Sequence, residues 1–416
     1  MINISVPKDN IINGTIIIPS SKSISNRALI IKALSKEEIK IENISISEDT
    51  NILAKSLKLV KNRNTKHKPI EINVGMAGTT FRFLTAFLSI QKGEYILTGE
   101  KRLRERPIKP LVDALIFLGA KIEYLENEGF APLKIKGNKL VGKEIEIDAK
   151  ISSQFITALM LIAPKIKNGI TINLKGKIAS LSYLKMTSIL MKHFNVESTF
   201  ERNKIRIPEQ KYKKNKIIVE SDWSSASYFY ESLALANKGK LILKNYTKNS
   251  IQGDSKLVEI YKDFGIHTEF NKDEIILTKK PFIKQKYKYN FISEPDLAQA
   301  VLATCVGLNI EAELTGLESL KIKETDRIHA LNKEFNKLNW ELIETKKEIY
   351  SLRKTGSFLP TINLSFNTYN DHRMAMCLAP LVLKHTKTTI HKHDVVRKSN
   401  PLFWELLVEI GFGITQ

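Results

Sequence analysis

The chain has few cysteines, and their placement excludes a disulfide-stapled scaffold. Only two of its 416 residues are cysteine, Cys305 and Cys377. Both lie in apolar, helix-like runs, "AQAVLATCVGL" and "RMAMCLAPLVL". Isolated cysteines in apolar runs are typical of buried thiols, so we expect a protein of a reducing compartment, the cytoplasm.

Long hydrophobic runs and targeting patterns are also missing. The longest apolar run, "FITALMLIA", is far shorter than the roughly 20 residues that a membrane-spanning helix needs. The N-terminus, "MINISVPKDN", lacks the basic-then-apolar pattern of a secretory signal. We therefore expect neither a membrane association nor a signal peptide.

Common cofactor motifs are absent as well. There is no G-x-x-x-x-G-K-[ST] loop, and "GMAGTT" does not have the glycine spacing of a dinucleotide fingerprint. Neither H-E-x-x-H nor a C-x-x-C pair occurs, so the sequence does not support a metal site. Aromatic residues do not alternate with basic ones as they would in a platform for stacking nucleic-acid bases.

Positive charge is abundant. Lysine and arginine number 65 against 44 acidic residues, which gives a formal net charge of +21. Three explanations compete: a lysine-rich composition with solvated surface charge, nucleic-acid binding, or a site for small polyanions. The arrangement of the charges has to decide between them.

A pattern of strand, polar turn, apolar helix and further strands occurs six times. The six segments begin at "GTIIIPSS", "IEINVGMAGTT", "KEIEIDAKISS", "NKIIVESDWSS", "YNFISEPDLA" and "INLSFNTYND", about 55 to 75 residues apart. Each resembles a βαβαββ unit, so the sequence predicts an α/β fold. Because 416 residues are too many for one core, we expect two domains of three units, separated near "KNKIIVESDWSSAS".

Every unit places Ser, Thr or Asp at the start of a helix, where such residues cap free N–H groups. If all six turns face the same way, the helix dipoles and unpaired N–H groups converge on one anion-binding region. Such a region would lie in a cleft between the domains. The repeat therefore favours small polyanions over a flat nucleic-acid surface.

Cations accompany several of these helix starts. In "PSSKSISNRAL" Lys22, Ser23 and Arg27 exceed what capping needs, and Ser23 and Arg27 share a helix face. "GEKRLRERP" carries three alternating arginines, Arg102, Arg104 and Arg106, which would share one face of an extended chain. Taken alone, they are weak evidence for an anion site. We interpret the first cluster as an anion site.

A second group of charged helix starts lies in the C-terminal half. In "SLKIKETDRIHAL" Lys323 and Arg327 are four residues apart, an unfavourable pairing unless an anion lies between them. Glu324 lies beside them and could transfer a proton. Arg373 precedes an entirely apolar run, and Lys398 lies just before the helix predicted from Pro401.

Six motifs in order now identify a family. "PSSKSISNRA", "AGTTFRFLTA", "RERP", "SSQFITAL", "KETDR" and "NDHRMAM" together resemble the 5-enolpyruvylshikimate-3-phosphate (EPSP) synthase family. The resemblance implies two domains of three βαβαββ repeats each, an inside-out α/β barrel, with the active site in the interdomain cleft. It implies hinges near Pro19–Ser20 and Glu220–Asp222, so that one domain comprises residues 20–220 and the other residues 1–19 plus 221–416.

The resemblance also implies an activity. The family transfers the enolpyruvyl group of phosphoenolpyruvate to the 5-hydroxyl of shikimate 3-phosphate and releases phosphate, a step toward chorismate and the aromatic amino acids. No metal or organic cofactor is required, and members are usually monomeric. Both substrates are polyanions, which the basic helix starts would suit.

By similarity, each site residue receives an expected role. The residues expected to hold shikimate 3-phosphate are Ser23, Arg27, Ser152, Ser153, Gln154, Ser180, Tyr183, Asp296 and Lys323. Those expected to hold phosphoenolpyruvate are Lys22, Gly78, Arg106, Gln154, Arg327, Arg373 and Lys398. Asp296 would accept the proton of the 5-hydroxyl, and Glu324, together with Lys22, would protonate the methylene carbon.

Two alternatives remain open at this point. UDP-N-acetylglucosamine enolpyruvyl transferase shares the fold, but it usually carries a reactive loop cysteine, whereas both cysteines here lie in apolar runs. A non-catalytic protein that binds polyanions or nucleic acid would be expected to have lost Asp296 or Glu324, and both are present. Both observations favour the first interpretation.

Overall fold

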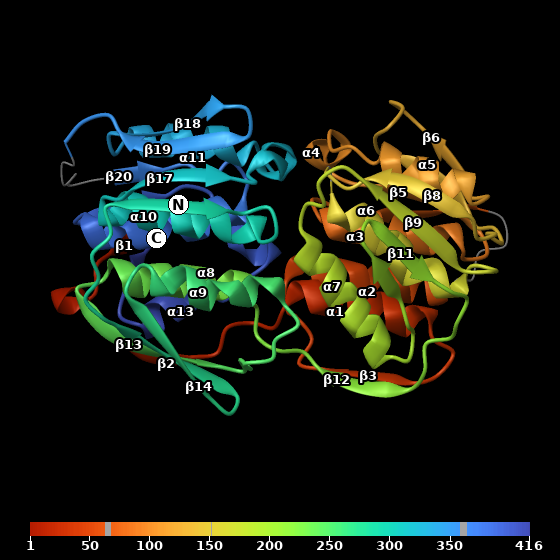
Figure 1. Ribbon diagram of the computed structural model, residues 1–416, viewed down its shortest axis with the longest axis horizontal. Helices are drawn as coiled ribbons and strands as arrows, with labels where there is room; N and C mark the ends of the chain where they lie inside the picture. Colours follow the sequence, from red (N-terminus) through yellow and green to blue (C-terminus); the bar gives the residue numbers. More distant parts are fainter. Residues whose placement is uncertain (63–67, 151, 358–363) are drawn as a thin grey trace. The chain divides into compact units, whose positions relative to one another are not determined.

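The computed structural model of the protein describes residues 1–62, 68–150, 152–357 and 364–416 (Figure 1). The chain forms two compact units, each with its own core. Unit 1 comprises Met1–Ser20 and Glu220–Gln416, and unit 2 comprises Ser21–Val219. No helix of the described residues is long and apolar enough to cross a lipid bilayer.

Unit 2 contains two four-stranded sheets, β4-β5-β7-β6 and β10-β11-β9-β8, and the parallel pair β12-β3. Its strands are β3 (Ile39–Glu42), β4 (Ile70–Asn73), β5 (Glu94–Thr98), β6 (Lys121–Tyr124), β7 (Leu133–Lys136), β8 (Glu144–Asp148), β9 (Ile170–Lys175), β10 (Thr199–Glu201), β11 (Lys204–Ile207) and β12 (Asn215–Ile218). Its α-helices are α1 (Lys22–Leu34), α2 (Glu48–Lys61), α3 (Gly78–Ser89), α4 (Lys101–Arg104), α5 (Lys109–Phe117), α6 (Ser153–Ile162) and α7 (Leu181–His193).

Unit 1 contains three four-stranded sheets, β14-β15-β13-β2, β16-β17-β19-β18 and β20-β21-β1-β22. Its strands are β1 (Ile2–Ser5), β2 (Ile11–Ile16), β13 (Lys238–Lys244), β14 (Ile266–Asn271), β15 (Glu274–Lys279), β16 (Lys286–Asn290), β17 (Glu311–Thr315), β18 (Trp340–Lys346), β19 (Ile349–Lys354), β20 (Leu364–Phe366), β21 (Lys387–Ile390) and β22 (Gly413–Thr415). Its α-helices are α8 (Trp223–Leu235), α9 (Leu257–Lys262), α10 (Ala298–Leu308), α11 (Arg327–Asn336), α12 (His372–Leu378) and α13 (Phe403–Glu409). The 3₁₀ turns that bear on the site are η3 (Gly253–Lys256), η4 (Pro295–Leu297), η5 (Glu318–Ile322) and η7 (His393–Lys398).

All five four-stranded sheets share one pattern, a parallel strand pair extended by two antiparallel strands. A helix joins the two strands of a parallel pair wherever these are consecutive in sequence, as α3 joins β4 to β5. This is the βαβαββ pattern that the repeat predicted. The predicted α/β class is confirmed.

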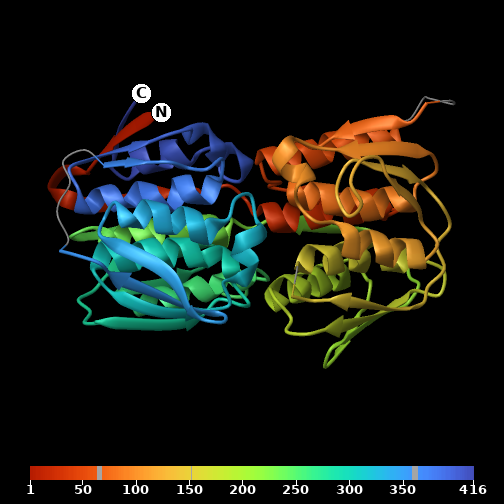
Figure 2. The ribbon, with the colours of Figure 1, turned by 90° about the horizontal axis from the view of Figure 1, so that it is seen from above.

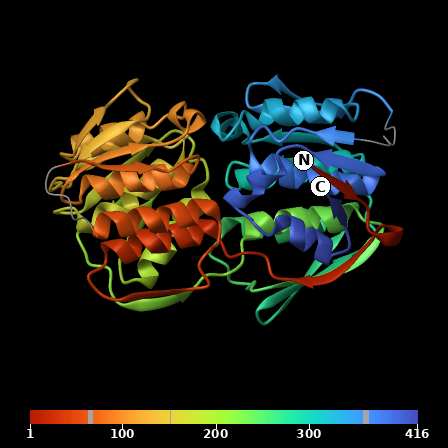
Figure 3. The ribbon, with the colours of Figure 1, turned by 180° about the vertical axis from the view of Figure 1, so that it is seen from behind.

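One detail of the repeat prediction was wrong. The sequence pattern placed "NKIIVE" at the start of the fourth unit, but its strand, β12, pairs with β3 in unit 2. The N-terminal strand β2 takes that place and pairs in parallel with β13 of unit 1. The reason is burial: Ile12 and Ile16 of β2 lie in the core of unit 1, whereas β12 is exposed along most of its length. Strand β1 likewise pairs with β22, so the chain ends lie side by side in unit 1 (Figure 3).

Central helices lie inside each unit, namely α3 and α6 in unit 2 and α8, α10 and α12 in unit 1, where Figure 2 shows sheets on the outside. Every residue of α8 and α12 is buried, and so are ten of the eleven residues of α10. Small hydroxyl residues fit within such a helix when they bond to its own carbonyls, as Ser232 does to Tyr228 O at 2.7 Å. Because these central helices pack together, their N-terminal ends can bring polar side chains into one cluster.

Candidate active site

The cluster in unit 1 is built around Arg327, the first residue of α11, which is only 2% exposed. Its Nε lies 2.7 Å from Asp371 Oδ2, and its Nη2 lies 3.0 Å from Glu324 Oε2. Its Nη1 lies 3.4 Å from Asp296 Oδ1. One buried guanidinium thus joins three carboxylates from three different segments of the chain.

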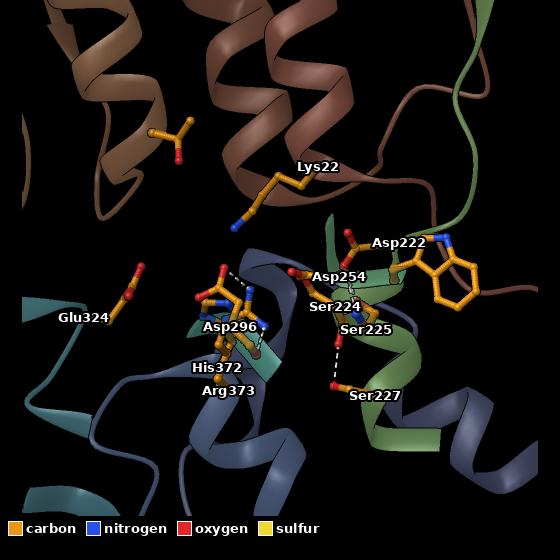
Figure 4. Close-up of polar contacts among 12 residues, drawn as sticks. Lys22, Asp222, Ser224, Ser225, Ser227, Asp254, Asp296, Glu324, His372 and Arg373 are labelled. Atoms are coloured by element: carbon orange, nitrogen blue, oxygen red, sulfur yellow. Dashed lines mark hydrogen bonds and ion pairs between the residues drawn. The ribbon is translucent and has the colours of Figure 1, made fainter. Parts of the chain in front are cut away.

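A second cation, Arg373, lies in the first turn of α12, where Asp371 is the N-cap and accepts the Arg373 backbone N–H at 2.9 Å. Arg373 Nη2 lies 2.8 Å from Asp296 Oδ2, and Nη1 donates to Asp296 O at 3.2 Å (Figure 4). Nη1 also donates to the buried Tyr228 hydroxyl at 3.3 Å. Arg373 therefore fixes both the side chain and the backbone of Asp296.

These cations dominate the electrostatics of Asp296. Burial opposes its ionisation, but Arg373, Lys323 and Arg327 outweigh burial and hold the pKa of Asp296 below its usual range. Burial likewise opposes the charge on Arg327, but Asp371, Glu324 and Asp296 outweigh it and raise the pKa of that guanidinium. Both groups are therefore ionised at neutral pH.

Glu324 connects a third cation to the cluster. Its Oε1 lies 2.9 Å from Lys398 Nζ, at the end of η7, and its side chain is 10% exposed. Lys323, at the end of η5, lies close enough to Asp296 to lower its pKa. The structure thus brings together all six residues predicted for this half of the site, namely Asp296, Lys323, Glu324, Arg327, Arg373 and Lys398.

In unit 2, Arg27 occupies the corresponding central position at 3% exposure. Its Nη1 donates to Ser23 O at 2.8 Å and its Nε to the Thr187 hydroxyl at 2.8 Å, and its Cζ lies 6.0 Å from the Tyr183 ring centroid. Burial lowers the pKa of Arg27 to about 10, which leaves it charged at neutral pH. Arg27 therefore links α1 to α7 and brings Ser23 and Tyr183 together.

Lys22, the first residue of α1, is held by a carboxylate that the sequence analysis did not identify. Its Nζ lies 3.0 Å from Asp49 Oδ2, in the first turn of α2, with side-chain exposures of 17% and 5%. The Thr80 hydroxyl donates to Asp49 O at 2.9 Å and ties α2 to α3. This pair positions the ammonium group of Lys22 within unit 2.

The starts of α6 and α7 contribute hydroxyl and amide groups. Ser152 is the N-cap of α6, and its hydroxyl accepts the Gln154 N–H at 3.2 Å. Gln154 Nε2 donates to Thr79 Oγ1 at 3.1 Å, which connects α6 to α3. Ser153, which follows Ser152 in the chain, is the first residue of α6. Ser180, buried before α7, has a left-handed backbone at φ 57°, which is uncommon for serine.

The residues Gly78 and Arg106 approach closely. A Cβ on Gly78 would lie 2.6 Å from Arg106 Nη1 and 2.8 Å from Arg82 Nη1, so only glycine fits there unless the guanidinium groups move.

The expectation that three alternating arginines share an extended face was wrong, because Arg102 and Arg104 lie in α4. They are exposed and pair with Glu105 and Glu126, whereas Arg106 alone is buried.

Sequence reasoning identified Asp296 and Glu324 but missed two other acidic partners of the predicted cations. Asp49 and Asp371 are buried and each holds a predicted site cation, but both resemble ordinary helix caps in the sequence. Asp254, in "SIQGDSKL", lies in the electrostatic field of Asp296 and was not singled out. The only available signal was an acidic residue directly before or within a short helix.

The predicted thiols are confirmed, since Cys305 and Cys377 are both free and buried. No group of three or more His, Cys, Asp or Glu side chains in the described ranges could hold a metal ion. The fixed cations of the site can bind anions, and its carboxylates and the Lys22 ammonium group can transfer protons.

Two units of repeated βαβαββ structure, with charged side chains at the starts of central helices, define an enolpyruvyl transferase fold. A solved structure of EPSP synthase from Acinetobacter baumannii has the same fold, with a TM-score of 0.77 over 100% of both chains at 21% identity. The family model of EPSP synthase (3-phosphoshikimate 1-carboxyvinyltransferase) matches residues 6–407. The chain belongs to this family.

Similar proteins support this membership along the whole length of the chain. A 3-phosphoshikimate 1-carboxyvinyltransferase of Bacteroides fragilis (strain YCH46) is 42% identical over 407 residues, which cover 97% of this chain and 96% of the relative. The protein of the same name from Colwellia psychrerythraea is 36% identical over 424 aligned residues, covering 96% and 97%. These matches favour EPSP synthase over the sister transferase and over a protein that only binds polyanions.

Proposed function

We propose that this chain transfers the enolpyruvyl group of phosphoenolpyruvate to the 5-hydroxyl of shikimate 3-phosphate and releases phosphate. The observation that carries the proposal is the buried cluster of Arg327, Arg373 and Lys398 with Asp296 and Glu324. Such a cluster combines fixed cations for an anionic substrate with carboxylates that can exchange protons. The whole-chain similarity to enzymes named for this reaction supplies the substrate identities.

The proposal assigns substrate contacts to residues of both units. Shikimate 3-phosphate is held by Ser23, Arg27, Ser152, Ser153, Gln154, Ser180, Tyr183, Asp296 and Lys323. Phosphoenolpyruvate is held by Lys22, Gly78, Arg106, Gln154, Arg327, Arg373 and Lys398. Two polyanionic substrates account for the concentration of buried cations, because each phosphate or carboxylate can accept charge-assisted hydrogen bonds from them.

The carboxylate of Asp296 is a poor base in the substrate-free cluster, since Arg373, Lys323 and Arg327 hold its pKa low. A bound phosphoenolpyruvate shares Arg327 and Arg373 with Asp296, so its own negative charge raises the proton affinity of that carboxylate. Substrate binding thereby prepares Asp296 to take the proton of the 5-hydroxyl. This explains how a carboxylate whose pKa is low in the substrate-free protein can act as a general base once phosphoenolpyruvate is bound.

The reaction then proceeds by addition and elimination. The 5-oxygen forms a bond to C2 of phosphoenolpyruvate while a proton from Glu324, assisted by Lys22, is added to the methylene carbon. Glu324 takes a proton back from the new methyl group of the resulting tetrahedral ketal, the C2–O bond to phosphate breaks, and the departing phosphate accepts the proton held by Asp296. The cations stabilise the charge on the departing phosphate.

The first test is phosphate release by the purified protein. Release is measured with phosphoenolpyruvate and shikimate 3-phosphate, and in parallel with UDP-N-acetylglucosamine as acceptor. We expect release with the shikimate ester only. Release with the nucleotide sugar only, or with neither acceptor, would contradict the proposal.

The second test separates binding from turnover. We expect Asp296→Asn and Glu324→Gln to retain binding of shikimate 3-phosphate in calorimetry while kcat falls by about 100-fold or more, the typical contribution of a general acid or base. Asp326→Asn is the matched control, because Asp326 caps α11 next to the cluster without an ion pair in the described structure. A near-normal kcat would remove the substituted residue from the mechanism.

We further propose that the enzyme acts as a cytoplasmic monomer and requires no metal ion or organic cofactor. The free thiols of Cys305 and Cys377 support a reducing compartment. Activity that survives exhaustive treatment with a chelator, together with a monomeric mass in light scattering, is the expected result.

A further inference from the structure

One sheet of unit 2 lacks its outer half. Strands β12 and β3 form a parallel pair, and no other strand of the described chain pairs with β3 (Figure 1). In the four-stranded sheets, two antiparallel strands extend the corresponding position, as β7 and β6 extend β5. Strand β3 therefore presents an open backbone edge of four residues.

The chain is also short at the point where two further strands would follow. In the unit of β4 and β5, strands β6 and β7 come after the second helix, α5, and with their turn they span residues 121–136. Only eight residues, 62–69, separate the second helix of the β12–β3 unit, α2, from β4. This unit is therefore shorter in sequence as well as in structure.

The missing strands leave one face of α2 open. In four of the complete units the second helix packs against the outermost strand of its sheet, as α5 does on β6, α9 on β14, α11 on β18 and α13 on β22. Helix α2 packs on α1 and α3. Its residues Ala54, Leu57 and Val60 line an open groove of about 900 Å³.

The groove has an apolar floor and a basic rim. Leu57 of α2 and Phe87 of α3 belong to the floor, and Ile39, the first residue of β3, lies at its border with the open strand edge. Two exposed acids, Glu37 and Glu38, line the rim. Five exposed lysines line it too, namely Lys32, Lys36, Lys58, Lys61 and Lys92.

The positive charge of the rim exceeds what the helix ends require. The C-terminal ends of α1, α2 and α3 lie at the groove, and each carries a partial negative charge of about one half. These ends and the two glutamates together do not balance five lysines. Lys32, Lys36, Lys58 and Lys61 form no ion pair within the described part of the chain. The groove therefore favours an anionic occupant.

We propose that the groove and the β3 edge form a docking site for an acidic, extended segment of a partner protein. The segment adds an antiparallel strand to β3, as the chain's own strands do in the other sheets. Side chains alternate between the faces of a strand, so one apolar face enters the groove while acidic residues meet the lysines. A second copy of the chain would bring the same lysines and be repelled, and a nucleic acid would use neither the strand edge nor the apolar floor.

The inference goes beyond the proposed function, because the groove contains none of the residues proposed to bind substrate. The test is binding of a synthetic probe to the purified full chain. The probe is a fluorescein-labelled peptide of about nine residues in which glutamate and valine alternate, the length and pattern of a strand with one apolar face. The control peptide carries N-methyl groups on its backbone nitrogens, so it keeps the charge but cannot donate hydrogen bonds to a strand edge. We expect fluorescence polarisation to show saturable binding of the probe and at least tenfold weaker binding of the control peptide.

Variants of the chain locate the bound peptide. Lys36→Glu combined with Lys58→Glu reverses two charges of the rim and should weaken binding about tenfold. Ala33→Phe adds a ring at an exposed position of α1 that lines the groove, and it should abolish binding. The matched control, Lys121→Glu combined with Lys139→Glu, changes two exposed lysines of unit 2 outside the groove and should bind like wild type. All these variants should release phosphate at the wild-type rate.

The opposite results overturn the inference. No saturable binding at about 1 mM peptide would do so, since even a weak specific contact has a Kd below that value. Equal binding of the N-methylated peptide, or equal loss in the control variant, would show adsorption by charge alone. Self-association that Ala33→Phe abolishes would assign the groove to a second copy, and tighter binding of an oligothymidylate in the same groove would assign it to nucleic acid. If Ala33→Phe does not fold, as judged by circular dichroism, the lysine variants decide. Peptide binding needs no substrate, so a failure of phosphate release would contradict only the proposed function.

Discussion

Asp371 is the residue whose removal should cost most stability in the cluster of unit 1. It is fully buried, caps α12 and holds the buried guanidinium of Arg327 at 2.7 Å. Asp371→Ala therefore removes a helix cap and one charge partner of Arg327 together. Breaking one side of a buried ion pair typically costs about 3 to 5 kcal/mol. We expect about 3 kcal/mol, because Glu324 and Asp296 still contact Arg327.

The chain offers a matched control in Asp326. Asp326 caps α11 in the same way, accepting the His329 N–H at 3.0 Å, but it is partly exposed and forms no ion pair in the described structure. Asp326→Ala should cost only the cap, about 1 kcal/mol. Asp371→Asn, which keeps a capping side chain and loses the charge, should fall between the two alanine variants.

The assay uses the distribution of tryptophan. All three tryptophans, Trp223, Trp340 and Trp404, lie in unit 1, so their fluorescence during urea unfolding reports on that unit. With a slope of about 3 kcal/mol per molar urea, Asp371→Ala should lower the midpoint by about 1 M and Asp326→Ala by about 0.3 M. Equal shifts for the two alanine variants would refute the reasoning, since the buried pair would then contribute nothing beyond the cap.

Two further predictions concern a buried acid and a glycine. Glu231, inside α8, is fully buried, neither of its carboxylate oxygens has a hydrogen-bond partner among the described residues, and burial raises its pKa well above 4.5. The stability gained from this protonated acid is complete below pH 4.5 and is lost as the pH rises toward the folded-state pKa. Glu231→Gln should therefore stabilise unit 1 increasingly above pH 5, by up to about 1.4 kcal/mol per pH unit. The exposed Glu409→Gln is the control and should show no such trend. A difference in urea midpoint between Glu231→Gln and wild type that is the same at pH 5 and pH 8 would contradict this prediction. Gly78→Ala should displace the guanidinium groups of Arg106 and Arg82 and raise the KM for phosphoenolpyruvate more than that for shikimate 3-phosphate, which steady-state kinetics would test.

Much of the architecture could be predicted from local patterns. The six-fold succession of strand, polar turn and apolar helix indicated the α/β class, because side-chain periodicity and helix caps act over a few residues. The same patterns could not assign β2 and β12 to their sheets. Both are short isoleucine-rich strands, and only burial of Ile12 and Ile16 in the core of unit 1 distinguishes them.

By itself, the sequence determined which residues carry the charge and that several of them stand at helix starts, as Lys22, Arg327 and Arg373 do. Only the tertiary structure decided which carboxylates hold them and how strongly. Asp371 resembles a simple cap in the sequence, yet it neutralises Arg327, and Asp254 shows no sign of its proximity to Asp296. The physical reason is that pKa values and ion pairs depend on burial and on distances between segments far apart in the chain, which local sequence patterns do not encode.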